Sequence, residues 1–305
     1  ERKVGRKLNI VWFKRDLRLL DHGPLSDACA NGKILPLYIL EPDLWKQPDV
    51  SYRHFLHLQH YLSQLDDMFI KKGAKLVIKV GEALPVLKSL ATRHNVKAIF
   101  SHYETWNKFS KDRDSAIRKW TDENSIDWKE YQQNGVVRNL NSRDGWSTLW
   151  HSHMRKKIYE VPEKILCVSE DSDNLPSCQD MSLEFDGFEP NSNLGKIEPG
   201  IVLKSFLTER GENYQREMSG PLLSADSCSR LSTHIAFGTI SIRTIFQRTQ
   251  EQTQKKLDLV GDKLKNWRAS YNSFQKRLRW HCHFIQKLED LRSIEWKNIH
   301  PIYDK

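Results

Sequence analysis

The sequence predicts an α/β domain with a doubly wound, parallel five-stranded sheet, followed by an acidic linker and an all-α region. Three observations support this prediction. Short apolar runs alternate with longer amphipathic stretches over residues 8–131, an order typical of parallel sheets that helices cover on both faces. Residues 160–199 contain ten acidic and two basic residues together with four prolines, which is typical of a surface segment. Beyond residue 200 the apolar spacing is helical, and no further strand is predicted.

The elements of the α/β domain follow in order along the chain. The predicted strands are residues 8–13, 34–40, 75–80, 97–101 and 126–131, and the predicted helices are residues 24–30, 52–72, 83–94 and 108–123. The strands lack strict alternation of apolar and polar residues, as expected where both faces are buried. The longest helix has apolar residues at helical spacing, Ser51 as its expected N-cap, and Gly73 as its expected end. The domains expected from these patterns are 1–135, a linker over 136–199, and 200–305.

Composition and charge restrict the possible functions. The net charge is +9, but it is +10 over residues 1–159, −8 over 160–199 and +7 over 201–305. The two basic regions favour a polyanionic partner such as nucleic acid, although many proteins of this charge bind none. The five cysteines have no CxxC spacing, so neither disulfides nor a structural zinc ion is expected. No apolar run is long enough for a signal peptide or a membrane-spanning helix. An intracellular, cytoplasmic protein without membrane contact is therefore expected.

Three segments carry the chemically informative residues. Residues 11–22 end the first strand in a charged loop, which lacks the glycine patterns of dehydrogenases and P-loop enzymes and could pair with itself. Residues 228–241 place hydroxyl side chains before a helix, where they either cap the helix or help to bind phosphate. Residues 274–284 form a basic and aromatic helix face, which is usually solvated unless an anion lies opposite. A metal site at His281 and His283 is not expected, because these side chains point apart on a helix.

Taken together and in this order, these segments resemble the photolyase/cryptochrome family. Residues 12–18 resemble the opening signature of that family, and residues 102–105 its loop after the fourth strand. Residues 134–137 and 142–146 fit the end of its first domain. Residues 229–232 with 237–241 are similar to its flavin-phosphate segment. The resemblance spans nearly the whole chain, and the ordered set of motifs is more specific than any single one.

The resemblance implies a flavoprotein that uses light to repair pyrimidine lesions in DNA, a lyase in which reduced FAD donates the electron. It assigns FAD binding to Tyr214, Cys228, Ser229, Arg230, Leu231, Ser232, Phe274, Arg277 and His281. It assigns DNA binding to Arg279 and Trp280, with Trp280 stacking on the lesion. In the family the α/β domain often carries an antenna chromophore. Its identity is open here, and Glu41 is the residue expected at that pocket, with a cap or a salt bridge as its alternative role.

The resemblance also implies that the helical domain is truncated at Lys305. The electron-transfer residues are expected beyond this residue, so no catalytic residue is assigned. The 305-residue chain alone is expected to be a monomer, to bind FAD weakly or not at all, and to be inactive.

Two alternatives to repair stay open. Arg277 stands where many repairing members have a glutamate, and the absence of this glutamate keeps open a cryptochrome-type blue-light receptor without repair activity. Cys228 stands where many members have a threonine that offers a hydroxyl donor. A flavin-free remnant that acts as a binding module is the second alternative.

Overall fold

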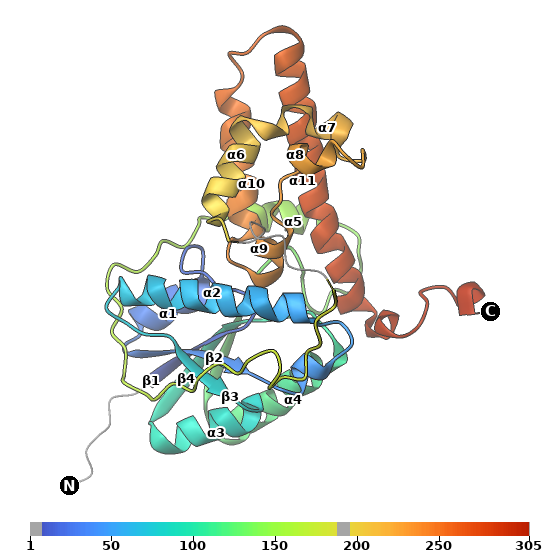
Figure 1. Cartoon of the computed structure of the whole chain (residues 1–305). Helices are drawn as coiled ribbons and strands as arrows, with labels where there is room; N and C mark the ends of the chain where they lie inside the picture. Colours follow the sequence, from blue (N-terminus) through green and yellow to red (C-terminus); the bar gives the residue numbers. More distant parts are fainter. Residues whose placement is uncertain (1–7, 188–195, 305) are drawn as a thin grey trace. The chain divides into compact units, whose positions relative to one another are not determined.

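A computed structural model describes residues 8–187 and 196–304 (Figure 1). The chain forms two compact units. The α/β unit comprises Glu1–Gln133 and Tyr159–Pro190, and the helical unit comprises Asn134–Ile158 and Asn191–Lys305. The segment 136–199, expected as a linker, is thus divided between the units near residue 158. None of the helices in the described ranges is both long and apolar enough to cross a lipid bilayer.

The α/β unit contains the expected sheet of five parallel strands, in the order β3-β2-β1-β4-β5. The strands are β1 (Leu8–Phe13), β2 (Ile34–Leu40), β3 (Val77–Val80), β4 (Val96–His102) and β5 (Asp127–Tyr131). In the centre, Ile10 of β1 lies opposite Leu35 of β2 and Ile99 of β4. The strand order reverses between β1 and β4. In doubly wound sheets, ligands bind outside the carboxyl ends of the strands at this point.

Helices cover both faces of this sheet. They are α1 (Gly23–Ala30), α2 (Tyr52–Ile70), α3 (Ala83–Arg93) and α4 (Lys108–Glu123), with a 3-10 turn at Leu44–Lys46. Figure 1 shows α1 and α2 on one face, and α3 and α4 on the other. Ile10 and Trp12 share a buried cluster with side chains of α3 and α4. Phe13 points to the opposite face, because side chains alternate along a strand, and it contacts Phe69 of α2.

Both predicted ends of α2 are confirmed. The Ser51 hydroxyl accepts a hydrogen bond from the backbone amide of His54 at 3.5 Å. Gly73 has a φ of +74°, a conformation that favours glycine, and the Ala74 amide then donates to the carbonyl of Phe69.

Residues 166–173 of the acidic segment lie along the outer edge of the sheet. The Ile34 amide donates to the Leu166 carbonyl at 2.8 Å, and the Asp173 amide donates to the Ile78 carbonyl of β3 at 2.8 Å. The Glu170 carboxylate pairs with Lys79 at 3.2 Å and also with Arg93 and His94. These bonds satisfy backbone groups that an edge strand otherwise exposes to other chains. The negative charge of the segment thus pairs with basic residues at this edge.

The helical unit contains no strand within its described residues. Its helices are α5 (Trp146–Met154), α6 (Pro199–Thr208), α7 (Tyr214–Glu217), α8 (Ser224–Ser227), α9 (Ser232–Phe237), α10 (Ile242–Lys255) and α11 (Gly261–Asp290), with 3-10 turns at Arg210–Asn213, Arg292–Glu295 and Pro301–Asp304. The longest helix, α11, contributes Trp267, Tyr271 and Phe274 to the buried core. Trp150 of α5 and Phe206 of α6 belong to the same core. The expected all-α character is confirmed.

Candidate functional site

The turn between α8 and α9 contains five of the residues expected to bind FAD. Arg230 has a φ of 61°, in the left-handed region, and the next residue, Leu231, has φ −95° and ψ 1°. Two successive residues of opposite helical hand turn their backbone amides toward one concavity, an arrangement that binds anions in many proteins. We call residues 229–232 the phosphate turn.

The donors of the phosphate turn are not used within the described protein. The backbone amides of Ser229, Arg230, Leu231 and Ser232 have no hydrogen-bond acceptor among the described residues. The Thr233 hydroxyl oxygen is buried and also has no partner there. Buried polar groups nearly always have a partner, so the Thr233 hydroxyl indicates room for a polar ligand beside it. The backbone amides of the turn are free to donate to an anionic group.

Capping does not explain the hydroxyl residues of the phosphate turn. Leu231 occupies the N-cap position of α9, and no side chain accepts a hydrogen bond there. The side-chain cap in this region belongs to the next helix, where the Ser241 hydroxyl accepts from the Thr244 amide at 2.9 Å.

Arg210 was not identified from the sequence, but it contacts the segment that leads into the phosphate turn. Its guanidinium donates to the carbonyls of Asp226 at 2.8 Å and Cys228 at 2.6 Å. These acceptors are backbone atoms, which leave no mark in a sequence.

Tyr214 and Phe274, both expected at the flavin, are packed against each other. Their rings meet edge to face at 5.9 Å, and Phe206 contacts both rings. Burial raises the pKa of Tyr214. Burial also raises the pKa of the Cys228 thiol, so this side chain is neutral near pH 7 and offers only a weak donor. Phe274 belongs to the core, so its role toward a flavin stays a prediction.

The remaining expected residues lie on α11. Arg277 is exposed, and its guanidinium lies over the Trp280 ring at 4.8 Å from the centroid. Arg279 donates to the Ser147 hydroxyl of α5 at 3.2 Å. His281 is partly buried. The structure therefore brings Arg277 and Trp280 together and directs Arg279 toward α5.

Trp280 borders a hollow of about 450 Å³ in the helical unit. Its lining residues are Trp146, Ser147, Arg279, Trp280, His283, Phe284 and Lys287. The Trp280 and Phe284 side chains are 50% and 59% exposed. Exposed aromatic rings next to cationic side chains are the combination on which unpaired bases stack.

In the α/β unit, Glu41 lies at the carboxyl end of β2 and is buried. Its Oε1 accepts from Arg113 at 2.7 Å, and its Oε2 accepts from the Ala83 amide at the start of α3 at 3.1 Å. Glu41 thus forms a salt bridge with α4 and accepts from the first turn of α3, whereas its expected alternative role was in the turn before Pro42. An antenna role for Glu41 stays a prediction.

Arg113 also binds Glu104 at 3.0 Å and Asp114 at 2.9 Å, and its side chain is only 6% exposed. Burial alone would raise the pKa of Glu104, but the positive charges of Arg15 and Arg113 hold this pKa at about 2. Burial raises the pKa of Glu41, and Arg113 opposes this shift. Arg113 thus offsets part of the cost of burying the Glu41 and Glu104 carboxylates.

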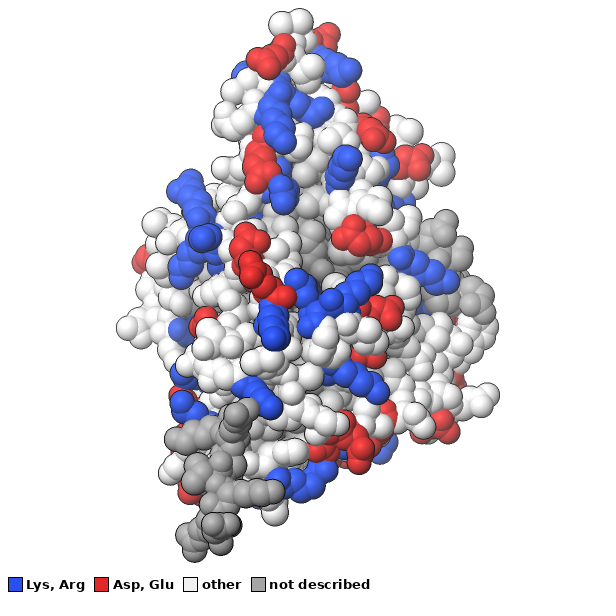
Figure 2. All heavy atoms as spheres, turned by 90° about the vertical axis from the view of Figure 1, so that its left-hand side faces the viewer, with Lys and Arg blue, Asp and Glu red and all other residues white. Residues whose placement is uncertain are grey.

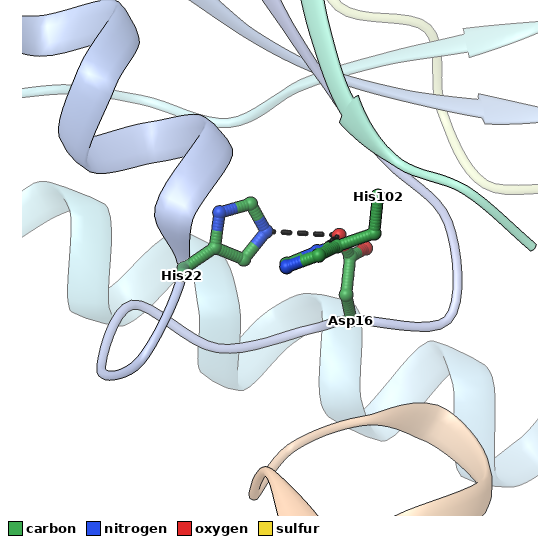
Figure 3. Close-up of side chains that lie close together, drawn as sticks. All are labelled: Asp16, His22 and His102. Carbon is green, nitrogen blue, oxygen red and sulfur yellow. Dashed lines mark hydrogen bonds and ion pairs between the residues drawn. The ribbon is translucent and has the colours of Figure 1, made fainter. Parts of the chain in front are cut away.

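Close to this network, a second buried cluster joins two of the sequence motifs (Figure 3). Asp16 lies in the loop after β1, His22 precedes α1, and His102 ends β4. The Oδ2 atom of Asp16 is 2.9 Å from Nε2 of His22 and 2.6 Å from Nδ1 of His102. Within the loop, Asp16 therefore bonds to His22, in agreement with one interpretation of the sequence. Asp16 also bonds to His102 of β4.

The hydrogen bonds fix the proton positions in this cluster. Nδ1 of His22 accepts from the Leu25 amide at 3.0 Å, so the proton of the neutral ring is on Nε2 and is donated to Asp16. A metal ion could bind Nε2 of His22 only after this nitrogen had lost its proton. The three side chains are therefore a hydrogen-bonded support for the loop.

This cluster predicts a loss of stability in acid. Burial lowers the pKa of His102 from 6.5 to about 3, and it also lowers the pKa of His22. Below pH 6.5 the unfolded chain then binds more protons than the folded chain. The free energy of unfolding should fall by about 1.4 kcal/mol per pH unit for one such histidine. Denaturant titrations between pH 7 and pH 4 measure this slope.

The matched variants are His102→Asn, which keeps a donor beside Asp16, and His300→Asn, which removes an exposed ring. His102→Asn should flatten the slope, and His300→Asn should not. Equal slopes in all three proteins would show that the buried histidine does not control acid stability.

Comparison with known proteins relates these features to one family. The sequence profile of the DNA photolyase family matches residues 9–144. The chain is 23% identical over 275 residues to a deoxyribodipyrimidine photo-lyase of Salmonella typhimurium, and the alignment covers 82% of this chain and 56% of that protein. It is 23% identical over 297 residues to the chloroplastic/mitochondrial cryptochrome DASH of Arabidopsis thaliana, which covers 84% of this chain and 49% of that protein. The chain thus spans about half the length of these relatives.

Among solved structures, an archaeal photolyase from Sulfolobus tokodaii, described with two FAD molecules, superposes with a TM-score of 0.67. The superposition covers 98% of this chain and 63% of that one, at 24% sequence identity. At this identity the match supports the fold.

Proposed function

Because this chain belongs to the photolyase/cryptochrome family, we propose that its helical unit binds the diphosphate of FAD and that the protein repairs pyrimidine lesions in DNA with light. The unused donors of the phosphate turn carry this proposal. Within the described parts of the chain, four successive backbone amides from Ser229 to Ser232 have no acceptor, and the neighbouring Thr233 hydroxyl has no partner. This donor set suits a diphosphate, because a diphosphate is negatively charged and offers only oxygen acceptors.

The proposed roles of the other residues follow from their positions. Tyr214 and Phe274 support the turn from the core, and Cys228 and Leu231 place it between α8 and α9. Arg277 and His281 lie on α11 one helical turn apart and would face the flavin. When bound, FAD supplies the excited electron donor for the reaction. The described residues bind and orient it.

The hollow beside Trp280 is the proposed site of DNA contact. A flipped-out base can stack on the exposed Trp280 ring, while Arg279 and Lys287 provide positive charge at the rim. Lysine and arginine side chains also lie among acidic ones on the face drawn in Figure 2. Contacts to phosphates from such residues add affinity without sequence preference.

A blue-light receptor without repair activity is the second candidate. The Arg277 guanidinium lies over the ring of Trp280, where a stacked base would have to displace it. Cation–π contacts of this kind are worth about 0.5–2 kcal/mol. Arg277 thus favours the receptor, while the exposure of Trp280 favours repair.

Substitutions in the phosphate turn test the FAD proposal. In the full-length protein, Ser229→Ala and Ser232→Ala should each weaken FAD binding about tenfold, because a hydrogen bond to a charged group is worth about 1.5–3 kcal/mol. Neither substitution should lower the free energy of unfolding by more than about 0.5 kcal/mol, because neither hydroxyl caps a helix. Fluorescence titration with FAD and urea denaturation of the flavin-free protein measure the two quantities.

Ser241→Ala is the matched control. It removes the cap of α10 and should lower the free energy of unfolding by about 1 kcal/mol without changing FAD affinity. If the Ser229 and Ser232 variants bind FAD as the wild type does, their hydroxyls have no part in cofactor binding.

A further inference from the structure

The hydrogen bonds of Arg210 are concentrated on the backbone that precedes the phosphate turn. Arg210 begins the 3-10 turn after α6, where its Nε donates to the Ser205 hydroxyl at 2.9 Å. One terminal nitrogen, Nη1, donates to the carbonyls of Asp226 and Cys228. The other, Nη2, lies 3.4 Å from the carbonyl of Ser229. One guanidinium therefore holds three carbonyls within four consecutive residues.

This arrangement determines where the next amides point. In a trans peptide the carbonyl of one residue and the amide of the next residue point in opposite directions. Because the carbonyls of Cys228 and Ser229 point toward Arg210, the amides of Ser229 and Arg230 point away from it. These are the first two unused donors of the phosphate turn.

The charges near Arg210 also suit an anion at the turn. Burial lowers the pKa of Arg210, and the positive charge of Arg230 lowers it further. The Arg230 Nε holds the carbonyl of Ala225 at 2.7 Å, so both guanidiniums are tied to the same stretch of backbone. Asp226 and Glu209 act on Arg210 in the opposite direction.

We propose that Arg210 is a positioning residue for phosphate recognition. By holding the carbonyls of Asp226, Cys228 and Ser229, it presents the amides of the phosphate turn to the diphosphate of the cofactor. This inference rests on the proposed function, since it assigns the turn to a diphosphate. Arg210 acts through the backbone and does not itself contact the ligand.

The test uses inorganic pyrophosphate as a probe of the turn, because it has the diphosphate and lacks the flavin. Thermal unfolding at increasing pyrophosphate concentration gives its dissociation constant for the chain. Arg210→Met should weaken pyrophosphate binding at least about tenfold, the effect of one lost charge-assisted contact. Arg210→Lys should fall between wild type and Arg210→Met, because one ammonium cannot hold three carbonyls in the guanidinium geometry. If Arg210→Met does not fold, the pyrophosphate affinity of Arg210→Lys still tests the proposal.

Arg216→Met is the control, since Arg216 lies nearby in sequence, is exposed and donates to Asn266 at 2.6 Å, away from the phosphate turn. It should bind pyrophosphate within about twofold of wild type. The proposal is overturned if Arg210→Met lowers the melting temperature but keeps the wild-type pyrophosphate affinity, or if the wild type binds no pyrophosphate.

Competition with FAD in the full-length protein separates this inference from the proposed function. If FAD displaces pyrophosphate from the wild type, both stand. If pyrophosphate binding depends on Arg210 but FAD does not compete, the positioning role of Arg210 holds and the assignment of the turn to FAD fails.

Discussion

Replacing Arg113 by methionine is expected to lower the free energy of unfolding of the α/β unit by about 3–5 kcal/mol, the usual result of removing one partner from a buried ion-pair network. The substitution leaves the carboxylates of Glu41, Glu104 and Asp114 without their common cation. Methionine fills a similar volume, so the loss should reflect charge rather than a cavity. Urea denaturation followed by tryptophan fluorescence measures the change.

Arg118→Met is the matched control on the same helix. Arg118 binds Glu130 and lies over Trp128, but its side chain is 38% exposed, so its loss should cost about 1 kcal/mol or less. The share of the Arg113→Met penalty that comes from Glu104 should be largest near neutral pH and shrink as the pH falls toward 2, because Arg113 helps to hold the pKa of Glu104 low. A penalty equal to that of Arg118→Met would show that the network contributes little.

The second large effect concerns DNA. Trp280→Ala should reduce the preference for damaged over undamaged DNA by about 1–3 kcal/mol, the value of one base stacked on an aromatic ring. Nonspecific binding and its salt dependence should stay nearly unchanged, because they depend on phosphate contacts. Titration of both DNA types at two salt concentrations, with wild type and variant, measures these quantities.

Trp296→Ala is the control for this experiment, because Trp296 is similarly exposed at 55% but does not line the hollow. It should leave the preference intact. Equal affinity of the wild type for damaged and undamaged DNA would favour the receptor. A preference that survives in Trp280→Ala would remove Trp280 from the recognition site.

The sheet could be predicted from sequence because burial on both faces imposes a strong pattern. All five strands were expected within two residues of their observed bounds, since the apolar runs are short and turn residues separate them. The course of the acidic segment could not be predicted. Its composition indicates a surface position, but the bonds from Ser172 and Asp173 to β3 depend on which strand lies at the edge.

The candidate site was predictable only where its residues are contiguous. The turn around Ser229 stands out because hydroxyl residues precede a helix, whereas Arg210 binds carbonyls that every residue has. Asp16 and His102 both lie in expected motifs, yet 86 residues separate them and no spacing rule joins them. The function of Arg113 was missed for the same reason, because its partners come from β2 and the loop after β4.

The decisive measurement for FAD binding is the flavin content of the full-length protein purified from its natural source. We expect a yellow protein that releases FAD on denaturation, close to one molecule per phosphate turn, and that loses FAD when Ser229 and Ser232 are replaced together. A colourless protein that takes up no FAD when the cofactor is added would show that the phosphate turn does not hold this cofactor.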